Sequence, residues 1–202
     1  MTTQLVPTNE STTPEEKAEI ILDVFADALR LSDEILNLRA TNALEAIGEY
    51  ALPFLEQRVA SGSISRGHKA RLWQAIDAIC INPNSDIDVN AAVVTALFAA
   101  LQETNRDLNA KAARAIGLMG ELIVPELIAR ALRHRRETSY CKRLLHLAGQ
   151  LTSSLDLLTQ SDLLILARMG NRQVREAAKY VLAKTLPNSP PLAFPESLAT
   201  QI

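Results

Sequence analysis

Aromatic residues make up only 4% of this 202-residue chain, which also has just seven glycines and two cysteines. A core with so few rings has to be built from Leu, Ile, Val and Ala. That composition suits closely packed helices better than a β-sandwich, where aromatic and β-branched residues are enriched. Two cysteines, Cys80 and Cys141, are too few for a disulfide framework. We therefore expect an all-α protein with free, mostly buried thiols in a reducing cytoplasm.

Long apolar segments and the usual signals for export are missing as well. The longest nearly apolar run, 91–101, is too short to cross a bilayer. The segment 1–14 has neither the basic nor the apolar region of a secretory signal. We therefore expect a cytoplasmic protein with no membrane partner, and we interpret the glycosylation-like tripeptide 9–11 as a chance match.

Motifs for catalysis, metal binding or a cofactor are also lacking. His68, His134 and His146 do not have metal-ligand spacing, so we expect surface or groove histidines. The segment 62–69 resembles a phosphate-binding loop, but its lysine is displaced and no strand precedes it, which favours a turn between helices. Cationic neighbours favour some thiolate character at Cys141, although no histidine shares its helical face. The sequence therefore predicts a protein that is not an enzyme and holds no cofactor or metal.

What the sequence does contain is a repeated phrase. The segment 48–55 reads Gly-Glu-Tyr-Ala-Leu-Pro-Phe-Leu, and 120–127 reads Gly-Glu-Leu-Ile-Val-Pro-Glu-Leu, seventy-two residues later. In each copy a glycine ends one amphipathic helix and a proline falls in the first turn of the next. The pattern Gly-Glu-x-x-x-Pro is thus a corner between helices, and its repetition predicts a repeat protein.

Gly, Pro and N-capping residues divide the chain into ten helices that pair into five hairpins. The clearest start is Thr13-Pro14-Glu15-Glu16, with a capping residue, a proline in the first turn and a capping-box carboxylate. A single repeat domain over 13–186 is expected between disordered tails, 1–12 and 187–202, which are rich in Thr, Ser and Pro. The predicted helices cover 14–31, 33–47, 51–61, 65–81, 87–103, 107–119, 122–135, 138–151, 160–168 and 171–185.

Apolar residues recur with one spacing in the second helix of each internal hairpin. A shift of seventy-two residues carries the first set onto the third, and shifts of thirty-two give the other two sets. This spacing predicts that the four sets face inward. The sets are Leu36, Ala40, Ala43, Leu44 and Ile47; His68, Leu72, Ala75, Ile76 and Ile79; Leu108, Ala112, Ala115, Ile116 and Met119; and Tyr140, Leu144, Leu147, Ala148 and Leu151.

These features resemble the HEAT-repeat family of armadillo-like α-solenoids. The segment 174–178, Val-Arg-Glu-Ala-Ala, is similar to the start of that family's second helices, and 112–117 and 43–48 are similar to their ends. The resemblance covers about 14–186 and specifies architecture rather than activity. It implies a right-handed superhelical α-solenoid of about five HEAT-like hairpins, whose second helices line the concave side.

A row of cations accompanies the apolar sets on the second helices. Residues three apart share one side of a helix, so stacked helices would align the row along one groove. Such a groove favours acidic peptides, phosphorylated segments or a nucleic-acid backbone; the alternative is an ordinary solvated face. The row consists of Arg39 with Asn42, Arg71 with Gln74, Lys111 with Arg114, and Arg143 with His146, joined by Arg172, Arg175 and Lys179.

Other side chains allow two interpretations. A second basic cluster surrounds the turn near residue 135 and fits either interactions with helix C-termini or a partner-binding patch. Trp73 is expected to be a core or inter-repeat anchor rather than a base-stacking residue, and Tyr140 falls on a core position. The second basic cluster contains Arg130, Arg133, His134, Arg135, Arg136, Lys142 and Arg143.

Charge is distributed unevenly: 1–56 carries eleven acidic against three basic residues, and 106–184 carries fourteen basic against seven acidic. We therefore expect a non-enzymatic scaffold that binds an acidic or phosphorylated segment of another protein in a basic concave groove. The alternative is a nucleic-acid-binding protein resembling the HEAT-type alkylpurine DNA glycosylases, which would need an acidic catalytic residue and grouped aromatics. A third interpretation, kinship with phycobilisome-lyase-like HEAT proteins, lacks a visible chromophore-holding motif.

Overall fold

The computed structural model describes residues 12–61, 64–82 and 87–185. Helices take up 83% of the described residues, and no strand occurs among them, which confirms the all-α class. Apart from Thr12, the predicted tails lie outside these residues. The chain forms two compact units, Met1–Gly120 and Glu121–Ile202. The single repeat domain over 13–186 stays a prediction.

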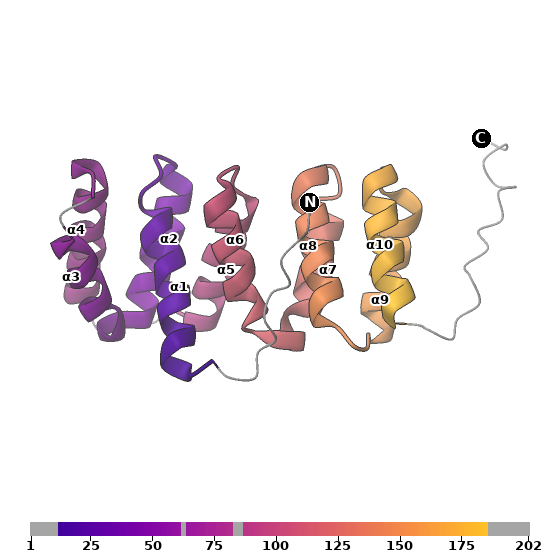
Figure 1. The fold of residues 1–202 in the computed structure, drawn as a ribbon, viewed down its shortest axis with the longest axis horizontal. Coiled ribbons are helices and arrows are strands. Elements are labelled where there is room, and N and C mark those ends of the chain that lie inside the picture. Colours follow the sequence, from indigo (N-terminus) through magenta and orange to yellow (C-terminus); the bar gives the residue numbers. More distant parts are fainter. Residues whose placement is uncertain (1–11, 62–63, 83–86, 186–202) are drawn as a thin grey trace, which may run out of the picture. The chain divides into compact units, whose positions relative to one another are not determined.

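The predicted helical ranges are all found, with boundaries within three residues of those expected, and neighbouring helices pack in pairs (Figure 1). The helices of the first unit are α1 (Pro14–Ala28), α2 (Glu34–Ile47), α3 (Leu52–Ala60), α4 (Arg66–Ile81), α5 (Val89–Gln102) and α6 (Arg106–Gly117). Those of the second are α7 (Val124–Arg133), α8 (Thr138–Leu151), α9 (Leu157–Met169) and α10 (Arg172–Thr185).

The N-terminus of α1 has the predicted capping box. The amide of Glu16 donates to Thr13 Oγ1 at 3.2 Å, and the amide of Thr13 donates to Glu16 Oε2 at 2.9 Å. Two amides that a helix leaves without partners at its start are thereby satisfied. Asp33, Ser65 and Asp88 cap α2, α4 and α5 in the same local way. Residues close in sequence thus fix where the helices begin.

The repeated phrase forms the same corner twice. Gly48 and Gly120 have φ angles of 70° and 68°, the only positive values among the described residues. Each glycine opens a short 3₁₀ turn, η1 (Gly48–Ala51) or η2 (Gly120–Ile123), and a proline follows in the first turn of α3 or α7. A positive φ strains any residue with a Cβ, so the glycines are required by the backbone. The corner is therefore a structural element.

The acidic residue of the second corner has a further role. The Glu121 carboxylate accepts hydrogen bonds from the amides of Ser153 at 3.0 Å and Ser154 at 3.1 Å, in the connection after α8. These amides, with the Ser153 hydroxyl, lower the pKa of Glu121. The ionised side chain thus ties the corner before α7 to the loop that follows α8.

The four apolar sets face inward as predicted. Their members are buried except for Ile47, Met119 and Leu151, which are partly buried near the helix C-termini. Trp73 is a correction: its side chain is 47% exposed, so it is not a core anchor. It lies one position after the buried Leu72, and one residue turns a helix by about 100°.

The order of hairpins in the first unit differs from the sequential stack that the sequence predicted. The pair α1–α2 lies between α3–α4 and α5–α6 (Figure 1). Moreover, α5 packs on α2, and α6 packs on α1. The first helix of the last hairpin, α5, therefore lies beside the second helix of the first hairpin, and α6 lies beside its first helix. The expectation that all second helices line one face is therefore wrong for α6.

Polar contacts hold α1 in this central position. Its Asp23 forms ion pairs with Arg58 of α3 and Lys111 of α6, and Lys111 also pairs with Asp27. Because these carboxylates are only about a quarter exposed, an unpaired charge there would be costly. The carboxylates of α1 thus pair with cations from the helices on both of its sides.

The C-terminal end of α1 is bound by α4. The His68 ring lies 2.8 Å from the Ala26 carbonyl oxygen, and the Arg71 guanidinium donates to the carbonyls of Leu29 and Arg30. Burial lowers the pKa of His68, with the Ala26 carbonyl and Asp27 opposing the shift. His68 is therefore a neutral, buried link between helices, not the surface or groove histidine that we expected.

The second unit follows chain order. Helix α9 packs on α7, and α10 packs on both α8 and α9. Its two hairpins therefore stack with first helix beside first helix and second beside second, as the sequence predicted.

The corner geometry predicts the effect of Gly48→Ala. We expect a loss of about 1–3 kcal/mol in unfolding free energy, because the φ of 70° and ψ of −145° at Gly48 are strained for alanine. Urea unfolding followed by circular dichroism measures it. The control is Gly117→Ala in α6, where φ is not positive and an added Cβ meets nothing within 4 Å. An equal loss at Gly117 would contradict the conformational explanation.

The ion pairs of α1 predict the effect of Asp23→Asn. Removing this charge leaves Arg58 and Lys111 without a shared partner and should cost about 1–2 kcal/mol, between the values for exposed and fully buried pairs. The same unfolding assay measures it. Glu19→Gln, at an exposed position one turn earlier, makes the same chemical change and should be nearly neutral. No difference between the two variants would contradict a central role for Asp23.

Candidate functional site

The predicted row of cations divides among three environments. Arg39 is exposed on α2, while Arg71 on α4 is partly buried and bound to the carbonyls after α1. Lys111 and Arg114 lie on α6, which packs on α1 rather than α2. The first unit therefore does not bring these side chains into one continuous row. Arg143 and His146 lie on α8 of the second unit.

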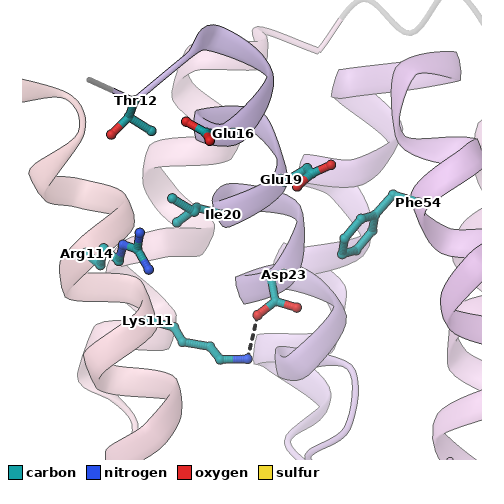
Figure 2. Close-up of a pocket in the computed structure, with 8 residues that line it drawn as sticks. All are labelled: Thr12, Glu16, Glu19, Ile20, Asp23, Phe54, Lys111 and Arg114. Carbon is teal, nitrogen blue, oxygen red and sulfur yellow. Dashed lines mark hydrogen bonds and ion pairs between the residues drawn. The ribbon is translucent and has the colours of Figure 1, made fainter. Parts of the chain in front are cut away.

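Lys111 and Arg114 line a cleft of about 490 Å³ that crosses α1 in the first unit. Figure 2 shows Glu16, Glu19 and Asp23 along α1, with the Asp23–Lys111 ion pair marked; Lys111 and Arg114 of α6 lie on one side, and Phe54 of α3 lies on the other, with Glu19 pointing toward it. Acidic residues outnumber basic ones in this cleft, so it is not the basic groove that the sequence predicted. Its lining residues are Thr12, Glu16, Glu19, Ile20, Asp23, Phe54, Lys111 and Arg114.

A second hollow, which we call the α8–α10 groove, has a volume of about 670 Å³ and lies between α8 and α10. Its polar lining residues are hydrogen-bond donors or cations, and none is an Asp or Glu. It therefore has the charge of the predicted groove, at the position of two members of the predicted row. The lining residues are Ser139, Lys142, Arg143, Leu145, His146, Gln173, Ala177 and Tyr180.

Hydrogen bonds at both ends hold α8 and α10 side by side. The Asn171 side chain, which caps α10, donates to the hydroxyl of Thr138, the first residue of α8. At the other end, the Lys184 ammonium donates to the Gly149 carbonyl. The two helices therefore run parallel. The groove begins in their first turns, at Ser139 and Gln173, where the helix dipoles favour negative charge.

The two walls of the groove differ in chemistry. The α8 wall carries Lys142, Arg143 and His146, whereas α10 contributes the uncharged Gln173, Ala177 and Tyr180. A Cβ at Gly149 would lie 3.3 Å from the Tyr180 ring, so the glycine allows this ring to approach the α8 backbone. The ring remains 60% exposed, and it offers an aromatic surface beside the cations.

The cations of α6 and α8 illustrate how the neighbouring helix changes a site. Lys111 and Arg114 have the same spacing as Arg143 and His146 and the same place beside their apolar sets. Helix α1 brings carboxylates to the first pair, while the groove-lining residues of α10 bring none to the second. Only the second pair lies in a hollow with an excess of positive charge.

The remaining predicted cations lie outside the groove. Arg172 and Arg175 are exposed on α10 and do not line it. Much of the second basic cluster is paired locally: Arg130 and Arg133 contact the Glu126 carboxylate, and His134 contacts Glu137. These contacts favour the structural interpretation for Arg130, Arg133 and His134, whereas Lys142 and Arg143 line the groove.

Several groove residues were missed by sequence reasoning. Gln173, Ala177 and Tyr180 lie at positions i, i+4 and i+7 of α10, a helical stripe visible in the sequence. Their register was uncertain because α10 follows the preceding second helix at a different interval. Ser139 gave no signal, since a serine near a helix start usually indicates capping.

The two thiols differ from expectation. Cys80 is exposed rather than buried, and Cys141 is buried with its Sγ 3.4 Å from the Ala131 carbonyl oxygen. Burial raises the pKa of Cys141 to about 11, so the expected thiolate character is wrong. The neighbouring cations along the chain do not overcome desolvation because the thiol faces inward.

No group of three or more His, Cys, Asp or Glu residues suited to a metal ion is found within 12–61, 64–82 and 87–185. No helix formed by these residues is sufficiently long and apolar to span a membrane.

The fold and site thus define an all-helical protein of paired helices with a basic groove in its second unit. No protein-family model, curated protein or solved structure matches the chain.

The burial of the thiols predicts that only one reacts in the folded protein. At pH 8, Ellman's reagent should modify Cys80 rapidly, because it is exposed, and leave Cys141 unmodified until urea unfolds the chain. Cys80→Ser should abolish the reaction of the folded protein. Rapid modification of Cys141 in that variant would contradict its burial and its raised pKa.

Proposed function

We propose that this protein is a non-enzymatic, cytoplasmic interaction module that binds an acidic segment of a partner protein in the α8–α10 groove. The observation that carries the proposal is the absence of carboxylates among the groove-lining residues, which include Lys142, Arg143 and His146. A hollow with one sign of charge attracts the opposite charge and increases its rate of association.

The shape of the groove supports a peptide ligand. Ala177 and the exposed Tyr180 ring supply apolar surface along α10, and Leu145, which also lines the hollow, is fully buried. A partner segment could therefore place apolar side chains in the hollow and carboxylates or phosphates against α8. Protein interfaces commonly combine such an apolar centre with polar contacts at the rim.

The helix pairs support a HEAT-like interpretation of the architecture as part of the same proposal. Two hairpins in chain order, α7–α8 and α9–α10, have the neighbour relations expected of adjacent hairpins in a solenoid. The duplicated corner supports a repeat origin for the hairpins on either side of it. In the first unit we propose only that each hairpin is HEAT-like, because the hairpins there do not stack in chain order.

A nucleic-acid backbone is the second candidate, favoured by an exposed Tyr180 ring next to cations. One aromatic residue is less than the series of stacking surfaces that single-strand binding uses. The salt dependence of binding distinguishes this candidate, since affinity for DNA or RNA falls steeply with salt as phosphate contacts release counterions. A protein segment with apolar contacts should show a weaker dependence.

Charge reversal in the groove tests the proposal. We expect Lys142→Glu to weaken binding of a fluorescein-labelled peptide of alternating Glu and Leu by about tenfold, because one attraction becomes a repulsion. Fluorescence anisotropy at 0.05 and 0.3 M salt measures the affinity. An Arg143→Gln variant should also bind more weakly, with circular dichroism confirming the fold.

The matched control is Arg168→Glu, which changes the net charge equally at an exposed position of α9 outside the groove. It should leave the affinity within about twofold of that of the unmodified protein. Equal losses in the Lys142 and Arg168 variants would indicate attraction by net charge alone. Unchanged binding by Lys142→Glu would exclude the α8–α10 groove as the site.

A further inference from the structure

The α8–α10 groove has two chemically different ends. Ser139, Lys142 and Arg143 line it over the first two turns of α8, where Gln173 faces them from α10. Farther along the helices, Ala177 and Tyr180 line it from α10 and His146 lines it from α8; Leu145, which also lines it, is fully buried. The Lys142 ammonium donates to Gln173 Oε1 at 3.4 Å at one end, and at the other the Tyr180 ring leaves no room for a Cβ at Gly149, since an added one would lie 3.3 Å from it. A donor-rich end is thus followed by an end that is apolar along α10.

From this arrangement we infer that the groove recognises a phosphorylated side chain in an extended segment, with an apolar side chain two residues away. The inference rests on the proposed function, and it specifies the ligand of the same site. The phosphate occupies the end near Ser139 and Lys142, and the apolar side chain packs against Ala177 and Tyr180.

The donor-rich end suits a phosphomonoester better than a carboxylate. Ser139, Lys142, Arg143 and Gln173 all carry hydrogen-bond donors, and two of them are cationic. A phosphoserine brings three acceptor oxygens and nearly two negative charges, so it can engage more of these donors than Glu can. The N-terminal turns of α8 and α10 add favourable dipoles on the same side. The site consists of the whole lined hollow, and the dipoles only strengthen it.

The spacing follows from helix geometry. The centres of the two ends lie about five helical residues apart, which at about 1.5 Å per residue is about 7 Å. Two residues of an extended chain cover the same distance at about 3.3 Å each, and side chains two apart point to the same side. An extended segment can therefore place a phosphate and an apolar side chain in the groove together.

The uncharged α10 wall favours a peptide over a nucleic acid. A nucleic-acid backbone presents phosphates at regular intervals and is usually followed by a track of cations. In the groove, the cations belong to α8, while Gln173, Ala177 and Tyr180 form the opposite wall. Arg172 and Arg175 lie outside it. A single phosphate beside an apolar side chain matches this arrangement more closely.

The experiment compares three labelled peptides that bear Leu two residues before and two residues after a central Ser, phosphoserine or Glu. With the full chain, anisotropy should show at least tenfold tighter binding of the phosphoserine peptide than of the other two. A fourth peptide, with phosphoserine flanked by Gly in place of both Leu residues, should bind several-fold more weakly. Inorganic phosphate at millimolar concentration should compete with the phosphoserine peptide.

Two variants separate the ends of the groove. Lys142→Glu should abolish the preference for phosphoserine over Ser, and Tyr180→Ala should weaken binding of all Leu-containing peptides by a similar factor while keeping that preference. Arg168→Glu is again the matched control and should retain both effects. Circular dichroism checks that each variant is folded.

The outcomes distinguish the inference from the proposed function. If the Glu peptide binds as tightly as the phosphoserine peptide and both need Lys142, the phosphate inference is overturned and the proposed function stands. If neither binds, both fail. Tighter binding of a single-stranded oligonucleotide than of any peptide, lost in Lys142→Glu, would also overturn the inference and assign the groove to nucleic acid.

Discussion

The arrangement of the first unit depends on the pairing of the α1 carboxylates with cations from both sides. Asp23 binds Arg58 of α3 and Lys111 of α6, and Lys111 also binds Asp27. These groups are partly shielded from water, so removing one partner leaves the others poorly compensated. Apolar packing alone would allow α1 to pack against several different helices. Its carboxylates restrict the choice to neighbours that place cations opposite them. The position of α1 between its two neighbouring hairpins follows from that match.

The neighbouring helix also sets the balance of charge in each of the two hollows. Along α6, the cations lie near the acidic face of α1, and the cleft there contains more acids than bases. Along α8, the neighbouring helix offers Gln173, Ala177 and Tyr180, and the groove keeps its positive charge. Two equivalent pairs of residues therefore acquire different electrostatic environments. The site is defined as much by the helix beside it as by its own side chains.

Local features of the fold were predictable because their causes lie within a few residues. The capping box of α1, the positive φ angles of Gly48 and Gly120, and the buried apolar sets all follow from short-range geometry. Trp73 and Cys80 were misassigned although their helix was correctly predicted. Their exposure depends on which face of α4 a neighbouring helix covers, and that is a tertiary property.

By itself the sequence determined the helices, their corners and the residues that face inward, since helix propensity, capping and apolar spacing act over single turns. Only the tertiary structure decided that α6 packs on α1, and that Lys111 is neutralised while Lys142 lines a basic groove. The physical reason is that the repeated apolar sets, built from similar Leu, Ile and Ala residues, fit one another in several orders. The choice among those orders rests on contacts between residues as far apart as Asp23 and Lys111.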